Sequence, residues 1–186
     1  MIISIDPGSS GGIAWSNNGI IEAEKMPDTD YGKVELLRRL RNEAYPNTEI
    51  PRCVMEKVGG FIGGRKVTKT IFCYHCHKNI IFESTEGDPG AFMFKFGDGN
   101  GFLRGTILTL GFRYDEYTPV QWMKLAGIHK DRGEGKTAWK NRLKDRAQKL
   151  FPQIKVTLST ADALVILDVA MKITSGYTQA KKELPF

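Results

Sequence analysis

Apolar residues come in short blocks over the first 25 positions, and this pattern predicts three strands. The blocks MIISI, GGIAW and GIIEAEK are separated by the turn-forming segments DPGSS and SNNG. Connections this short join neighbouring strands that run in opposite directions. We therefore expect the three strands to pair antiparallel.

The next stretch changes to a helical period. Within residues 33–44, Val34, Leu36, Leu37 and Leu40 recur at the spacing of one helix face. The segment RCVMEK that follows is typical of a short buried strand. Because a helix between two strands indicates a crossover connection, this strand is predicted to lie parallel to the first one.

Helical patterns dominate the last part of the chain. GFLRGTILTLGFRYDEYTP predicts a helix followed by a strand, and KTAWKNRLKDRAQKLFP predicts an amphipathic helix. STADALVILDVAMKIT is apolar nearly all round, so we expect this helix to be buried against the sheet. Together the elements predict a single α/β domain over residues 1–176, with a tail over residues 177–186.

The middle of the chain breaks this regularity with clusters of glycine. The run KTIFCYHCHKNIIFE predicts a hairpin within an insert of about residues 64–90. The run FMFKF then alternates with a period of two. This period places Phe92, Phe94 and Phe96 on one face, in the core or in a dimer interface.

Three acidic residues stand where the pattern predicts elements to begin or end. Asp6 ends the first strand, Glu56 ends the parallel strand, and Asp162 lies in the first turn of the apolar helix. Parallel neighbours end at the same edge of a sheet, so Asp6 and Glu56 are expected to approach each other. Each acid also has a structural explanation, as a turn residue, a solvated strand end or a complement to a helix dipole.

A metal site is the chemical interpretation of the three acids together. Carboxylates that lie close repel one another unless a cation lies between them. Carboxylate oxygens favour Mg²⁺ or Mn²⁺, and a pair of such ions suits phosphodiester hydrolysis. The trio therefore indicates a site for phosphoryl chemistry.

The order and spacing of these segments resemble the RuvC-type Holliday junction resolvases of the RNase H-like superfamily, including the phage and plastid members. IISIDPGSSGGIAW resembles their first motif, VMEKVGGF their second and STADALVI their last. TPVQWMKLAGI, the lysine cluster and AQKLFP resemble their connecting region. The resemblance covers roughly residues 1–61 and 92–175. It implies an RNase H-like mixed five-stranded sheet flanked by helices, with an inserted hairpin.

The resemblance also implies a function. It predicts an endonuclease that depends on Mg²⁺ or Mn²⁺, with two ions per active site, and that resolves four-way DNA junctions by paired symmetrical nicks. Asp6, Glu56 and Asp162 would be the metal ligands. One lysine near them would assist catalysis, and Lys136 is our choice. A homodimer suits this reaction, because a junction offers two equivalent strands to two active sites.

The chain departs from the family pattern at one position. The family usually has a fourth acidic or histidine ligand three or four residues before the last aspartate, where this chain has Ser159 and Leu158. Asp168 is not an easy substitute, since six residues along a helix place it about 240° round from Asp162. Full activity of this chain therefore depends on whether Ser159 is tolerated.

Positive charge is concentrated in one segment. The net charge of the chain is +6, whereas residues 120–155 alone hold ten Lys or Arg against three acids. A basic stripe on a helix predicts salt-sensitive contacts with a DNA backbone, although a solvated helix face has the same pattern. Phe61, in the glycine-rich EKVGGFIGG, would stack on bases or pack in the core. The predicted DNA contacts are Lys130, Arg132, Lys140, Arg142, Lys144, Gly59, Gly60 and Phe61.

Cys73 and Cys76 form a Cys-x-x-Cys pair on the predicted hairpin, with the spacing of a zinc knuckle. Zinc takes four ligands, and the sequence has no second such pair. Further ligands could come from His75, His77, Cys53, His129 or a second protomer. Without them, the two thiols and their neighbouring histidines simply lie on an exposed hairpin.

Composition and hydropathy narrow the class of protein. Hydrophobic residues make up 41% of the 186 residues and charged residues 26%, as in ordinary globular proteins. No apolar run is long enough to span a membrane and no secretory leader pattern is present, so we expect a cytoplasmic protein without a membrane partner. The alternatives to a resolvase are an actin-like kinase, for which the chain is short, a catalytically impaired DNA-binding protein, and an RNase H-like nuclease for RNA–DNA hybrids or flaps.

Overall fold

The computed structural model describes residues 1–44, 50–59, 65–86 and 90–182. The chain forms two compact units. The first, which we call the body, comprises Met1–Val58 and Asn100–Phe186, and the second, the arm, comprises Gly59–Gly99. In the described part of the chain, no helix is both long and apolar enough to cross a membrane.

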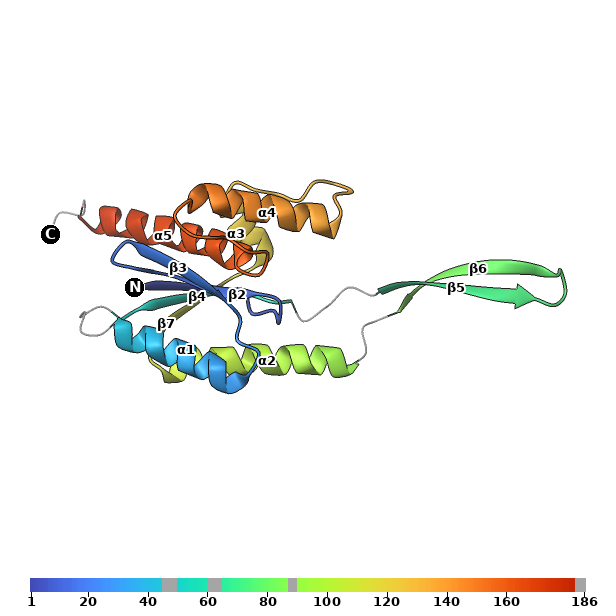
Figure 1. The fold of residues 1–186 in the computed structure, drawn as a ribbon, viewed down its shortest axis with the longest axis horizontal. Coiled ribbons are helices and arrows are strands. Elements are labelled where there is room, and N and C mark those ends of the chain that lie inside the picture. Colours follow the sequence, from blue (N-terminus) through green and yellow to red (C-terminus); the bar gives the residue numbers. More distant parts are fainter. Residues whose placement is uncertain (45–49, 60–64, 87–89, 183–186) are drawn as a thin grey trace. The chain divides into compact units, whose positions relative to one another are not determined.

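The body is built on a mixed sheet of five strands in the order β3-β2-β1-β4-β7 (Figure 1). The strands are β1 (Ile2–Ile5), β2 (Gly12–Asn17), β3 (Ile20–Lys25), β4 (Arg52–Glu56) and β7 (Arg113–Tyr117). β2 runs antiparallel to β1 and β3, whereas β4 runs parallel to β1 and β7. The predicted RNase H-like sheet, with its parallel strand after the first helix, is confirmed.

Helices cover both faces of this sheet. α1 (Asp30–Glu43) lies on one face together with the C-terminal part of α2 (Gly90–Thr109). α3 (Pro119–Leu125), α4 (Lys136–Leu150) and α5 (Ala161–Lys182) lie on the other. α5 continues through Lys182, beyond Gly176, where the sequence predicts the folded domain to end.

The body has a buried hydrophobic cluster on each face of the sheet, and side chains alternate along β1 between these two faces. Ile3 and Ile5 are fully buried in the cluster that includes α1. Ser4, which lies between them, faces α5, and its Oγ donates a hydrogen bond to the carbonyl oxygen of Ala163 over 2.6 Å. Because this hydroxyl is fully buried, the bond satisfies a polar group that would otherwise destabilise the fold. It also fixes the first turn of α5 beside β1.

The arm contains the predicted hairpin. β5 (Arg65–Cys73) pairs antiparallel with β6 (Lys78–Glu86) along their whole length, which confirms the prediction. The alternating face predicted for Phe92, Phe94 and Phe96 is wrong, because these residues lie in α2. Residues two apart in a helix point about 200° away from each other. A short apolar run does not by itself distinguish a strand from a helix.

Candidate active site

Asp6 and Glu56 lie at the same edge of the sheet. Ile5 and Met55 are partners in the parallel pairing of β1 and β4, and Asp6 and Glu56 are the residues that follow them. The negative charge of Asp6 raises the pKa of Glu56, so the two carboxylates are close enough to repel each other. The predicted approach of these two acids therefore occurs in the structure.

Asp162 reaches the same edge from the first turn of α5. Its charge raises the pKa of both Asp6 and Glu56, and only 7% of the residue is exposed. The buried hydrogen bond between Ser4 and Ala163 holds this turn against β1. The three acids that the sequence predicts as a group are thus brought together by two strands and a helix.

The turn after β1 is shaped around the Asp6 carboxylate. The N–H of Asp6 donates to the carbonyl oxygen of Gly12 over 2.9 Å, and the N–H of Gly8 donates to Asp6 Oδ1 over 3.3 Å. A Cβ atom on Gly11 would lie 2.3 Å from the Asp6 carbonyl oxygen and 2.7 Å from its Cγ. A Cβ atom on Gly12 would lie 2.7 Å from the carbonyl oxygen of Ser159. Glycine is required at both positions, because the turn packs directly on the acid and on the start of α5.

Burial and mutual repulsion make two of the acids easier to protonate. Burial, followed by the charge of Asp162, raises the pKa of Asp6 from 3.8 to about 6. Burial, followed by the charges of Asp6 and Asp162, raises the pKa of Glu56 from 4.5 to about 7. Concentrated negative charge at a partly buried edge is typical of a functional site, since structure alone gains nothing from it.

Lys140 of α4 is the base that lies among these acids. Its Nζ is 2.5 Å from Asp162 Oδ2, and its side chain is 32% exposed. Burial opposes the charge of this lysine, but the hydrogen bond and charge of Asp162 and the charges of Asp6 and Glu56 raise its pKa overall. Sequence reasoning treats Lys140 only as a DNA contact. The structure gives it a direct contact with the candidate site.

Lys136, the predicted catalytic lysine, lies elsewhere on α4. It is the first residue of the helix and is exposed, one turn before Lys140. Both lysines belong to the same stripe, but Lys140 is three residues before Leu143, which is buried in the core. The sequence alone does not separate the two lysines, because Lys136 stands three residues before Trp139 of the same helix face.

The residues at this edge fit a divalent cation by their chemistry. Asp162 Oδ1 is buried, and no donor in the described part of the chain lies within hydrogen-bond distance of it. Asp162 contacts the Lys140 ammonium directly, and the charges of Asp6 and Glu56 act on the same group. Carboxylate oxygens are also the ligands that suit Mg²⁺ and Mn²⁺. In this conformation, however, no three His, Cys, Asp or Glu side chains of the described residues lie close enough to hold one ion. The positive charge among the acids is that of Lys140.

The position of the family's fourth ligand carries no acid here. Leu158 is 49% exposed, and the backbone of Ser159 packs against Gly12. Asp168 is further along α5 and accepts a hydrogen bond from Lys172 over 2.7 Å. Its charge is not among the causes of the raised pKa values of Asp6 and Glu56.

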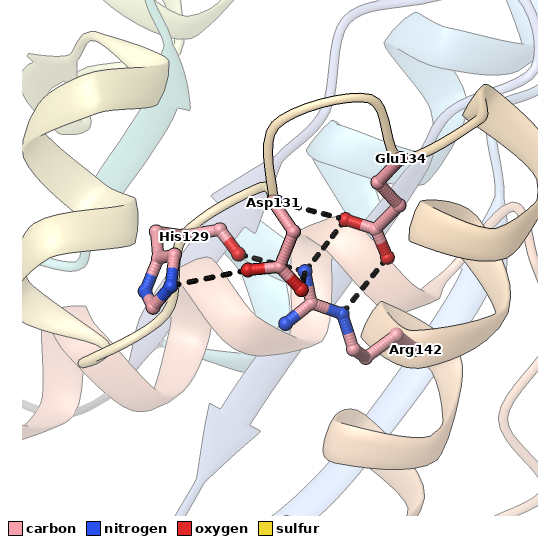
Figure 2. A network of polar contacts seen from close by, with 4 residues as sticks. All are labelled: His129, Asp131, Glu134 and Arg142. Atoms are coloured by element: carbon pink, nitrogen blue, oxygen red, sulfur yellow. Dashed lines mark hydrogen bonds and ion pairs between the residues drawn. The ribbon is translucent and has the colours of Figure 1, made fainter.

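Arg142, a predicted DNA contact, is engaged within the protein. Figure 2 shows its guanidinium group bound to both carboxylate oxygens of Glu134, at 3.0 and 2.6 Å, and to the carbonyl oxygen of His129 at 2.8 Å. Asp131 lies 3.4 Å from the same group, and the ring of Trp139 stacks against it at 4.9 Å. Arg142 therefore holds the loop between α3 and α4 in place, which sequence reasoning misses.

The other predicted site residues fall into four groups. Lys130 and Arg132 are exposed and Lys144 is half-buried, all on the loop before α4 or on α4 itself. Gly59 is exposed at the start of the arm. Gly60 and Phe61 lie outside the described residues. Cys73 and Cys76 belong to the arm, where Cys73 ends β5 and Cys76 lies in the turn that follows.

Comparison with known proteins gives matches only among solved structures. No protein-family model and no curated protein matches the chain. A structure described as "Thermus thermophilus RuvC structure" has 14% sequence identity and a TM-score of 0.46, and the match covers 94% of this chain and 96% of that one. "T. thermophilus RuvC in complex with Holliday junction substrate" has 14% identity, the same coverages and a TM-score of 0.49. The assignment of an RNase H-like fold rests on the strand order and directions of the sheet.

Proposed function

We propose that the chain is a metal-dependent, structure-selective DNA endonuclease that resolves four-way junctions by paired symmetrical nicks. The observation that carries this proposal is the convergence of Asp6, Glu56 and Asp162 at the carboxyl edge of two parallel strands. The sequence motifs that contain these acids resemble those of junction resolvases in order and spacing.

Asp6, Glu56 and Asp162 would hold Mg²⁺ or Mn²⁺, with two ions per active site. When bound, these ions lower the pKa of a coordinated water and neutralise charge on the scissile phosphate and leaving oxygen. The protein contributes the placement of the carboxylates. β1 and β4 fix the backbones of Asp6 and Glu56, and the bond from Ser4 fixes that of α5 beside them.

Lys140 supplies a positive charge at the acidic edge that does not depend on a bound metal ion. Its ammonium group lies against Asp162 and is attracted by Asp6 and Glu56. An ammonium held at this point attracts the phosphate backbone to the acidic edge, which would otherwise repel it. We therefore assign the assisting lysine to Lys140 in place of Lys136.

DNA binding would use exposed and half-buried basic residues of the segment that contains Lys140. Lys130, Arg132 and Lys144 belong to the same basic segment as Lys140 and provide charge for contacts with phosphates. Arg142 is given a structural role instead, because its Nε and Nη2 atoms already bind Glu134 and His129. A homodimer would present two acidic edges to the two equivalent strands of a junction.

A second candidate function is junction binding without cleavage. Two observations favour it: the Lys140 ammonium lies directly on Asp162, and Ser159 stands where the family has a further ligand. Under this alternative, the ion pair with Lys140 replaces the metal. An RNase H-like nuclease for RNA–DNA hybrids or flaps is distinguished from both by its substrate.

The test uses the full chain with a labelled four-way DNA junction, a duplex, a flap and an RNA–DNA hybrid, each with Mg²⁺ and with EDTA. We expect paired nicks in the junction alone, only with Mg²⁺. Tight junction binding without cleavage would support the second candidate, and Ser159→Asp would then be expected to produce nicking. Equal cleavage or binding of all four substrates contradicts the proposal.

A further inference from the structure

The turn of the arm hairpin brings two cysteines together. Cys73 is the last residue of β5 and pairs with Lys78, the first residue of β6. Residues 74–77 form the turn between them, so Cys76 lies in the turn itself. Cys76 is exposed and Cys73 is partly exposed, and no disulfide joins them.

The backbone of this turn is arranged around the sulfur of Cys73. The N–H groups of Cys76 and His75 and the side chain of Cys76 donate hydrogen bonds to this sulfur, and they lower the pKa of the Cys73 thiol. N–H groups that converge on one sulfur stabilise its thiolate form, which is the form that binds metals. The turn therefore favours a thiolate at Cys73 before any ligand is present.

The residue after the second cysteine has an unusual backbone conformation. His77 has a φ of 49°, in the left-handed region that side chains other than glycine and asparagine rarely adopt. This conformation closes the turn directly after Cys76, so that the chain enters β6 with both sulfurs on the same short turn. Two cysteines separated by two residues on a hairpin turn have the ligand spacing of a zinc site.

One chain supplies only half of the ligands that zinc takes. Structural zinc sites have four ligands in a tetrahedral arrangement. In the described part of the chain, no third His, Cys, Asp or Glu joins Cys73 and Cys76 around one position, so His75 and His77 do not complete the set. Cys53 is fully buried in the core of the body, where burial raises the pKa of its thiol. None of the described residues supplies the missing ligands in this structure, and a second chain is a source of them.

The strands next to the turn expose large apolar side chains. Ile71 and Ile80 face each other across the hairpin and are 54% and 41% exposed. Phe72 contacts Tyr74 edge to face at 5.2 Å, and Tyr74 is 84% exposed. A two-stranded hairpin is marginally stable in water unless it packs against something. Among the described residues, this end of the hairpin therefore has neither a complete set of metal ligands nor an apolar cover.

We propose that Cys73 and Cys76 form half of a Zn²⁺ site that is completed by the same two cysteines of a second copy of this chain. A twofold arrangement supplies four thiolates to one ion and lets the two hairpin ends cover each other's apolar side chains. Each thiol that binds loses its proton to the solvent, so binding weakens as the pH falls. This site is separate from the acidic edge of the body and does not depend on the proposed nuclease activity.

The test measures metal stoichiometry on the full chain, reduced, stripped with chelator and titrated with Zn²⁺ under anaerobic conditions. We expect the wild-type chain to bind one zinc ion for every two chains in excess of the zinc that the Cys73→Ser/Cys76→Ser variant binds. Titration with Co²⁺ as a spectroscopic probe is expected to give thiolate-to-metal absorption with the intensity of four thiolates. Cys73→Ser and Cys76→Ser should each abolish this signal. The controls His75→Ser and His77→Asn, which keep both thiols, should retain it.

Several results would overturn the proposal. One zinc ion per chain, or loss of the Co²⁺ signal in His75→Ser or His77→Asn, would indicate a site completed within a single chain. Failure of the reduced wild-type chain to bind Zn²⁺ would show that the turn is not a metal site. Far-ultraviolet circular dichroism of the serine variants verifies that the chain remains folded. Dimerisation through the body cannot mimic the result, because the readout is ions per chain.

Discussion

The acidic edge of the body and the turn of the arm place reactive side chains by different means. Asp6, Glu56 and Asp162 are held by elements buried on both faces of a five-stranded sheet. Cys73 and Cys76 are held by one exposed hairpin and its own turn. The body stabilises an unfavourable concentration of charge through its core. The described residues of the arm form no buried core, so the geometry of its turn is local.

This difference indicates what a bound cation would do in each of the two regions. At the acidic edge a bound cation would relieve repulsion that the fold already tolerates, and Lys140 does so in part. At the hairpin turn a cation would stabilise the conformation of the turn, because a hairpin of two strands alone is only marginally stable in water. The predictions below test this contrast, from the largest expected effect to the smallest.

The largest effect is expected from Asp6→Asn. Asparagine keeps an oxygen that accepts the N–H of Gly8, so the turn should survive, while the charge at the acidic edge is lost. We expect the cleavage rate of a four-way junction with Mg²⁺ to fall by at least about a thousandfold, or about 4 kcal/mol. Single-turnover assays measure this rate. Asp28→Asn, which changes an exposed acid, is the control. A fall of less than tenfold would show that Asp6 does not act in cleavage.

Gly11→Ala tests whether the turn after β1 packs closely on Asp6. The new Cβ would lie 2.3 Å from the Asp6 carbonyl oxygen, so the turn or the carboxylate must move. We expect a loss of about 2 to 3 kcal/mol in the free energy of unfolding, measured with urea. The matched control is Gly105→Ala in α2, where the added Cβ meets no atom within 4 Å. Equal stability of the two variants would argue against close packing of the turn on Asp6.

Lys140→Met and Lys136→Met separate the two candidate lysines. Loss of Lys140 leaves the buried Asp162 without its ion pair, and we expect about 2 kcal/mol of destabilisation in EDTA, discounted because the lysine side chain is 32% exposed. Lys136 is exposed, so its substitution should change stability by less than about 0.5 kcal/mol. Urea unfolding at pH 8 measures both. A larger effect of Lys136→Met would reverse our assignment.

The smallest effect is the pH dependence of stability without metal. The folded-state pKa values of Asp6 and Glu56, about 6 and about 7, exceed their ordinary values of 3.8 and 4.5. The folded state therefore binds more protons, and its stability should fall as the pH rises from about 4 to about 7. We expect about 1 to 2 kcal/mol over this window in EDTA, allowing for partial exposure. Glu56→Gln should flatten the curve, and an unchanged slope would contradict the raised pKa.

Much of the body could be predicted from the sequence, because its signals are local. The apolar run before Asp6, the short strand before Glu56 and the apolar helix after Asp162 each predict an element by their own period. The parallel relation of two strands follows from the helix between them. These patterns predict where the strands before Asp6 and Glu56 end and where the helix that holds Asp162 begins. The approach of the three acids could therefore be predicted as well.

The remaining features depend on tertiary packing that no local pattern encodes. Lys140 and Lys136 are equivalent in the basic stripe, and only the packing of α4 against α5 brings Lys140 to Asp162. Arg142 looks like a DNA contact until the folded loop brings Glu134 and His129 to it. Phe94 and Phe96 lie in α2, although their alternating pattern is also that of a strand.

The most direct test of the central claim is Mn²⁺ binding to the full chain, measured by electron paramagnetic resonance with the Cys73→Ser/Cys76→Ser variant as background. The claim is that the three acids, and not the cysteines, form the site for a hard divalent cation. We predict saturable Mn²⁺ binding in this background, its loss on addition of Asp6→Asn or Asp162→Asn, and its retention with Asp28→Asn. Binding that survives both acid substitutions, or no binding in the background variant, would contradict the account.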